Sequence, residues 1–166
     1  MSQAATTADT PPLEGRRVDG LLAAVDLSRD PEPVLAQAIT LARGLDCQLT
    51  VLHVHAPGLA AAASEMPDMG SGPVPERAVV ERTLETQRRE QLDGLRARIP
   101  RDVGAVSRFE VGDPAEVVPR VAEDFDALVL GSSDRGVFAR MLERDMPSRA
   151  QRKARCMTVI VPTEDE

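Results

Sequence analysis

The stretch Gly131–Gly136 combines residue types and a spacing that suggest phosphate chemistry. Its two glycines enclose four residues, as in a P-loop, where backbone N–H groups surround phosphate oxygens. A P-loop continues with Lys and then Ser or Thr, but Val137 and Phe138 stand in those places. Because the cation and the magnesium-binding hydroxyl are missing, the stretch is not a Walker A motif.

Three further side chains have types that suit binding or proton transfer. Asp26 follows an apolar run, and two interpretations stay open: a ligand-binding carboxylate, or a hydrogen-bond acceptor for the loop before the next helix. His53 and His55 share one face of a predicted strand. We interpret His53 as a packed histidine with satisfied hydrogen bonds, whereas His55 lies nearer the strand end and can face a cleft.

Neither a catalytic set nor a metal site can be assembled from the sequence. Cys47 and Cys156 each lie beside an apolar run, where a buried, reduced thiol is the usual outcome. No CxxC or Cys/His metal-ligand spacing occurs, and there is no nucleophile–base pair. We therefore predict no catalytic residues, no metal and no enzymatic activity.

Apolar runs predict the strands that must position these residues. The runs at 21–25, 49–54 and 127–130 are mostly apolar, which indicates strands buried on both faces. The run at 157–161 predicts a last apolar strand. Residues 103–111 alternate toward their end, as an edge or half-exposed strand does.

Helices connect these strands. One begins at Asp30-Pro31, a long charged helix carries apolar residues on one face between Val80 and Ile99, and a third follows Asp113-Pro114. A further helix is expected near Asp145. Acidic and basic residues interleave over 82–98, so the remaining surface of the long helix is expected to be a solvated face.

The alternation of strands and helices predicts the fold class α/β, with an open parallel sheet covered by helices on both faces. In such sheets a ligand lies beyond the carboxyl ends of the strands, where the strand order reverses. The residues found at those ends are Asp26, Val54, His55, Gly112 and Gly131.

The composition excludes several classes of partner. The chain has 166 residues, which fits one domain, and 27 acidic against 20 basic residues give a net charge of −7. This balance disfavours nucleic acids and acidic membranes as partners. The chain has no Trp, no Tyr and three Phe, so it lacks the aromatic platforms on which single-stranded nucleic acids stack.

The ends of the chain and one internal segment are expected to carry no chemistry. Residues 1–16 are polar and predicted to be a disordered tail without the features of a signal peptide. Residues 56–75 are predicted to form a mobile loop, and 163–166 form an acidic tail. Since no apolar run reaches the ~18 residues that span a membrane, we expect a cytoplasmic protein with no membrane insertion.

A family resemblance covers residues 17–162, where the chain resembles the universal stress proteins of the UspA type. The segments that carry it are Leu22–Ser28, Leu49–Val54, Val111–Glu116, Leu128–Ser132 and Val159–Pro162. The resemblance implies a five-stranded sheet in the order 3-2-1-4-5. It also implies a homodimer formed by pairing of the last strands, here Met157–Val161.

The resemblance also implies a nucleotide site. In nucleotide-binding members an Asp after the first strand contacts adenosine, and backbone at the end of the second strand contacts adenine. The phosphates lie on a loop of the form Gly-x2-Gly-x9-Gly-Ser. The residues that this comparison carries into a cofactor-binding site for ATP or AMP are Asp26, Val54, Gly112, Gly131 and Ser132.

Three positions depart from the family's phosphate loop. Asp134 stands at the second glycine, and Arg144 and Asp145 stand at the Gly-Ser pair. Asp tolerates the left-handed conformation and caps helices well, so both acids keep the backbone but place carboxylates where a polyphosphate would lie. That repulsion costs on the order of a few kcal/mol, which Arg135, Arg140 and Arg144 can offset. We therefore predict that ATP binding is lost or much weakened.

Three functions are compatible with the sequence. The preferred one is a dimeric, cytoplasmic stress-response protein that regulates an unknown protein partner and has no firm cofactor. The alternative is a sensor module that binds ATP or AMP. A weak ATPase is ranked last, because no catalytic set can be assembled.

Overall fold

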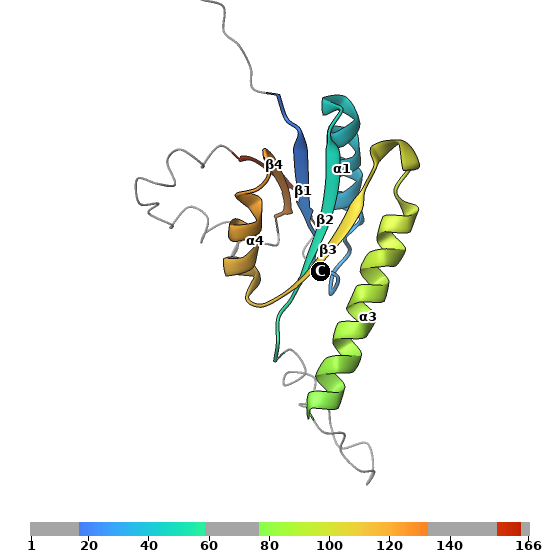
Figure 1. The fold of residues 1–166 in the computed structure, drawn as a ribbon, viewed down its shortest axis with the longest axis vertical. Coiled ribbons are helices and arrows are strands. Elements are labelled where there is room, and N and C mark those ends of the chain that lie inside the picture. Colours follow the sequence, from blue (N-terminus) through green and yellow to red (C-terminus); the bar gives the residue numbers. More distant parts are fainter. Residues whose placement is uncertain (1–16, 59–76, 133–155, 164–166) are drawn as a thin grey trace, which may run out of the picture.

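The computed structural model describes residues 17–58, 77–132 and 156–163, in which strands and helices alternate (Figure 1). The elements in chain order are β1 (Gly20–Ala24), α1 (Glu32–Leu45), β2 (Gln48–His55), α3 (Arg77–Arg98), the 3₁₀ helix η1 (Arg101–Val103), β3 (Val106–Val111), α4 (Pro114–Ala122), β4 (Ala127–Gly131) and β5 (Met157–Val161).

The five strands form one parallel sheet in the order β3-β2-β1-β4-β5, which confirms the predicted fold class and strand order. In the middle strand β1, Ala23 pairs with Val51 of β2 and with Val129 of β4. The chain runs outward from β1 to β3 and then returns to β4 on the other side of β1. The strand order therefore reverses between β1 and β4, where a sheet of this type leaves a crevice at the carboxyl ends.

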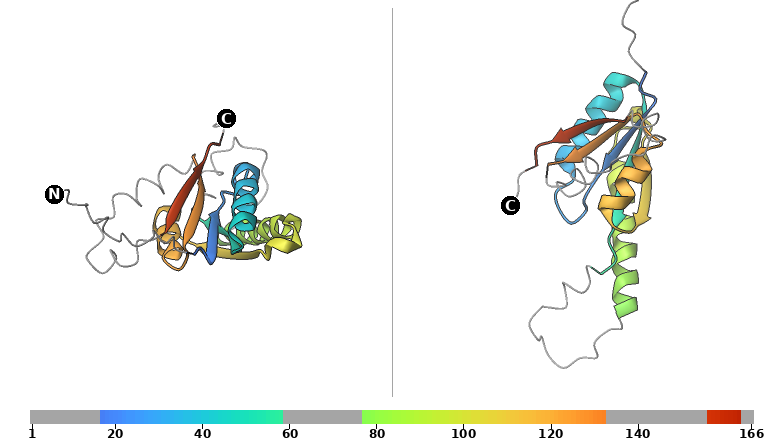
Figure 2. Two further views of the ribbon diagram at one scale, coloured as in Figure 1. Left: turned by 90° about the horizontal axis from the view of Figure 1, so that it is seen from above. Right: turned by 90° about the vertical axis from the view of Figure 1, so that its left-hand side faces the viewer.

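Helices cover both faces of the sheet, as predicted, and create two separate hydrophobic cores (Figures 1 and 2). The core under α1 and α3 includes Leu21, Ala38, Val51, Leu92, Leu95 and Val129. The core under α4 includes Leu22, Leu52, Val118, Val121 and Leu128. Successive residues of β1 enter opposite cores because side chains alternate across a strand.

The start of α4 is fixed against the end of β2. The side chain of Asp113 caps the helix by accepting a hydrogen bond from the backbone N–H of Ala115 (2.9 Å), and Pro114 occupies the first turn. Gly112, just before the cap, has a φ of +152°, and its N–H donates to the carbonyl of His55 (2.9 Å).

The third strand is shorter than the sequence pattern predicted. A strand was expected from residue 103, but Val103 closes a 3₁₀ turn, Gly104 follows with a φ of +61°, and β3 begins only at Val106. Val103 is buried in the core under α1, so this apolar residue packs in the core although it belongs to a turn rather than a strand. β3 is an edge strand, as predicted, and Val106 and Val111 at its ends are exposed.

Several predicted segments lie outside the described residues. They are the tail 1–16, most of the loop 56–75, the helix near Asp145, and residues 164–166 of the acidic tail. Within the described ranges, no helix is both long enough and apolar enough to cross a membrane.

Candidate functional site

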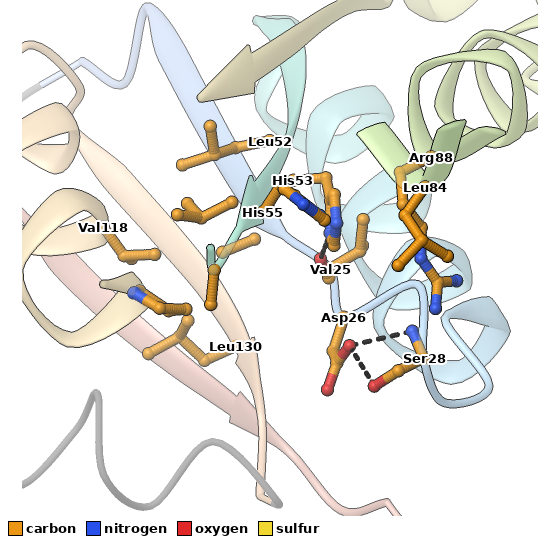
Figure 3. Close-up of a pocket in the computed structure, with 14 residues that line it drawn as sticks. Val25, Asp26, Ser28, Leu52, His53, His55, Leu84, Arg88, Val118 and Leu130 are labelled. Atoms are coloured by element: carbon orange, nitrogen blue, oxygen red, sulfur yellow. Dashed lines mark hydrogen bonds between the residues drawn. The ribbon is translucent and has the colours of Figure 1, made fainter. Parts of the chain in front are cut away.

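A pocket of about 250 Å³ opens at the carboxyl ends of β1, β2 and β4, where the strand order reverses. Its walls come from both faces of the sheet, with Val118 of α4 on one side and Leu84 of α3 on the other (Figure 3). Most lining residues are apolar. The polar ones are Asp26, Ser28, His53, His55 and Arg88. Such a pocket suits a small ligand with an apolar part and a polar end.

Asp26 follows β1 and is hydrogen-bonded to the turn after it. Its Oδ1 accepts from the backbone N–H (2.8 Å) and from the hydroxyl (2.6 Å) of Ser28, as Figure 3 shows. Its Oδ2 lies 3.7 Å from Nε of Arg29. Asp26 is therefore a hydrogen-bond acceptor for the loop before α1, which is one of the two roles considered for it. A contact of the same carboxylate with a ligand stays a prediction.

His53 is a packed histidine with a hydrogen-bond partner, as predicted. Its Nδ1 lies 3.0 Å from the carbonyl oxygen of Val25, and because a carbonyl only accepts, Nδ1 carries the hydrogen. Burial lowers the pKa of His53, against the hydrogen bond to Val25 and the charge of Asp26, which raise it. The charge of Arg88 adds to the lowering. At neutral pH the imidazole is thus uncharged, and its Nε2 is an acceptor.

His55 is also buried and lies close to Glu81 of α3. Its Nε2 is 3.6 Å from Oε2 of Glu81, beyond hydrogen-bond distance, and no described residue gives this buried atom a hydrogen bond. The ring stacks on Phe109 with the centroids 6.2 Å apart. Oε1 of Glu81 accepts from the backbone N–H of Gly58 (2.9 Å), so Glu81 joins α3 to the residues after β2.

Arg88 is a pocket residue that the sequence interpretation missed. The charged residues over 82–98 were expected to be solvated, but Arg88 is half-buried and lines the pocket. Its Nη1 donates to the carbonyl of Leu27, directly after Asp26. A usable signal was the spacing of Leu84, Arg88 and Leu92, which recur every four residues and so share the buried stripe of the helix.

The structure brings Asp26 and Val54 together in the pocket, whereas three other predicted site residues lie outside its lining. Gly131 is a buried part of β4, and Gly112 turns the chain into α4. The hydroxyl of Ser132 accepts from the backbone N–H of Thr163 (2.9 Å), after β5. The remaining three, Asp134, Arg144 and Asp145, lie outside the described residues.

The described ranges contain neither a metal centre nor an activated thiol. No three His, Cys, Asp or Glu residues there lie close enough to hold a metal ion. Burial raises the pKa of Cys156 to about 11 and also raises that of Cys47, so both thiols are protonated at neutral pH and are poor nucleophiles. The hydroxyl of Ser28 donates to a carboxylate rather than to an imidazole.

Comparison with known proteins identifies the family. The family model for the universal stress proteins matches residues 19–162, which include the pocket and the stretch after β4. The chain belongs to the universal stress protein family. This confirms the resemblance seen in the strand-end segments.

Solved universal stress proteins share this fold at low sequence identity. A family member from Burkholderia pseudomallei is 23% identical, with a TM-score of 0.62 over 90% of this chain and 100% of its own. UspA from Lactobacillus plantarum is 16% identical, with a TM-score of 0.60 over 89% of this chain and 99% of its own. The Archaeoglobus fulgidus protein in complex with dAMP is 20% identical, with a TM-score of 0.52 over 88% and 99%. No curated protein sequence matches the chain.

Proposed function

We propose that this universal stress protein is a non-catalytic regulatory protein whose pocket binds the nucleoside part of an adenine nucleotide, with weak affinity for ATP. The pocket itself carries the proposal, because it combines apolar walls with the carboxylate of Asp26. A purine base packs between Val54, Val118 and Leu130, and ribose hydroxyls donate to the carboxylate of Asp26. The complex of the Archaeoglobus fulgidus relative with dAMP supports this assignment.

Weak ATP affinity follows from the residues after β4. Asp134 and Asp145 stand where the nucleotide-binding pattern has Gly and Ser, and each adds a carboxylate against a polyphosphate. The hydroxyl of Ser132 supports the same conclusion, because it is already held by Thr163 rather than available to an anion. The site therefore favours the nucleoside over the triphosphate tail.

The regulatory part of the proposal includes a homodimer in the cytoplasm that contacts an unknown protein partner. Among the described strands β5 forms an edge of the sheet, and it exposes Met157 (47%) and Ile160 (42%). An uncovered edge of this kind tends to pair with another strand, so we place the dimer contact there. Catalysis has less support, because the described residues offer no activated nucleophile.

The proposal is tested by thermal unfolding of the purified protein with adenosine, or with ATP and magnesium, each at millimolar concentration. We expect adenosine to raise the Tm and ATP to raise it less. Asp26→Ala should abolish the shift. The control Asp30→Ala, which removes a carboxylate bonded only to the backbone of Glu32 among the described residues, should keep it.

Two further measurements complete this test. Nucleotide released from the denatured protein should contain no stoichiometric ATP by anion-exchange chromatography. The triple variant Asp134→Gly, Arg144→Gly, Asp145→Ser should bind ATP more tightly, and unchanged affinity would mean that other residues weaken the site. If adenosine and ATP both leave the Tm unchanged, the ligand part of the proposal is wrong, and a protein that acts through its partner without a nucleotide remains.

A further inference from the structure

Arg88 differs from its neighbour on α3 in the partners of its charge. Arg89 has a carboxylate oxygen of Glu85 at 2.7 Å from its Nη2. Arg88 instead donates to two uncharged acceptors, the carbonyl of Leu27 and Oε1 of Gln91 (2.9 Å). No carboxylate oxygen of the described residues lies within 4.0 Å of its guanidinium nitrogens. The charge of Arg88 is therefore not paired with an acid in the part of the chain that is described.

The guanidinium of Arg88 is held in place by two hydrogen bonds, and some of its N–H donors are not used by them. Both of its hydrogen bonds use Nη1, so within the described ranges Nε and Nη2 donate to no residue. Nε and Nη2 lie side by side in a planar fork that matches two oxygens of a phosphate or carboxylate. A half-buried cation with uncharged partners favours an anion in the adjoining pocket, because the attraction between the two charges strengthens as water is excluded.

The surroundings of Arg88 place this anion site at the polar end of the pocket. Its bond to Leu27 puts the guanidinium next to the turn that carries Asp26 and Ser28 (Figure 3). The carboxylate of Asp26 is oriented by Ser28 and has Arg29 at 3.7 Å, and His53 is neutral. A ligand that donates hydroxyls to Asp26 and presents an anion a few ångströms away therefore meets matching partners.

We infer that Arg88 is the anion-binding residue of this pocket and that the preferred ligand is a nucleoside monophosphate, with its ribose on Asp26 and its phosphate on Arg88. This inference rests on the proposed function and names the ligand class. One guanidinium pairs with one phosphate group, whereas the further phosphates of a triphosphate would have no matching cation in the described pocket. The phosphate contact thus comes from α3, on the face of the sheet opposite α4.

The test is calorimetric titration of the full chain with adenosine and with AMP, without metal. We expect AMP to bind about tenfold more tightly than adenosine at low salt, as for one charge-assisted pair, and this advantage should shrink at 0.5 M salt. Arg88→Gln removes the charge but keeps a donor for Leu27, so it should reduce the AMP-to-adenosine affinity ratio to about one. Arg88→Lys should keep part of the ratio.

The control is Arg82→Gln, the same change on the same helix. Among the described residues Arg82 bonds only to the carbonyl of Ala78, and it is not part of the pocket. Its ratio should equal that of the wild type. Equal binding of AMP and adenosine by the wild type, or equal weakening of both by Arg88→Gln, would overturn the inference while the proposed function stands. If neither compound binds, both fail.

Discussion

Single side chains anchor the turn after β1 from three directions. Ser28 fixes the carboxylate of Asp26 within the turn, His53 of β2 holds the carbonyl of Val25, and Arg88 of α3 holds the carbonyl of Leu27. The bonds of His53 and Arg88 satisfy backbone carbonyls of the turn, and the Ser28 hydroxyl orients a carboxylate. The polar end of the pocket is therefore built before any ligand arrives, which reduces the ordering entropy that binding must overcome.

His53 should make the stability of the fold depend on pH. Burial holds its pKa below the unfolded value of 6.5, so below pH 6.5 the unfolded chain binds more protons than the folded one. The contribution of the neutral imidazole is complete above pH 6.5 and is lost as the pH falls toward the folded pKa. We expect the urea midpoint to fall from pH 7.5 to 5.5, and to fall less in His53→Gln. An equal fall in both proteins would exclude His53 as the cause.

At the scale of elements, the sequence predicts best where burial is uniform. β4 is recognisable because a strand covered on both faces is apolar at nearly every position. β5 has the predicted bounds and is apolar too, although Met157 and Ile160 are exposed at the edge of the sheet. Val103 misleads because an apolar residue in a buried turn resembles the first residue of a strand. Arg88 misleads because its charge suggests solvent, although its spacing from Leu84 places it on the buried stripe.

In the candidate site, too, some residues can be predicted from the sequence and others cannot. Asp26 and Val54 can be predicted, because the carboxyl ends of neighbouring parallel strands meet at one edge of the sheet. The contact of Ser132 with Thr163 cannot, because it depends on how the ends of β4 and β5 lie beside each other. The same holds for Arg88, whose bond to Leu27 joins residues 61 positions apart.

The turn between β3 and α4 tolerates no side chain at Gly112. A Cβ there would lie 2.9 Å from Cγ2 of Val117, and the φ of +152° is one that residues with a side chain rarely adopt. We expect Gly112→Ala to lower the free energy of unfolding by about 1–3 kcal/mol, measured by urea denaturation. Gly44→Ala, in α1 with nothing within 4 Å of the new methyl, should instead raise it by about 0.5–1 kcal/mol. A neutral Gly112→Ala would contradict the strain argument.

At the scale of the whole molecule, the sheet formed by the described strands has two edge strands that differ in their expected use. β3 forms one edge and exposes Val106 (41%), and β5 forms the other and exposes Ile160 (42%). The two side chains are almost equally accessible, so exposure alone does not decide which edge pairs. The choice of β5 rests on the family resemblance and on the apolar character of that strand.

Light scattering at micromolar concentration tests this choice. We expect the mass of a dimer for the wild type and of a monomer for Ile160→Lys, because a charge in the contact would be desolvated without a partner. Val106→Lys, with nearly the same exposure on the opposite edge, should stay dimeric. A monomeric wild type, or dissociation caused by Val106→Lys instead of Ile160→Lys, would refute pairing through β5.

The pocket is a place where the two cores, otherwise divided by the sheet, share one surface. Leu84 and Arg88 reach it from the layer of α3, and Pro114 and Val118 reach it from the layer of α4. A molecule bound there would contact both helical layers at once and would hold them together at the carboxyl ends of the strands. Amide hydrogens in α3 and α4 would then exchange more slowly together, although the two helices lie on opposite faces, whereas α1, which contributes no wall, would change least.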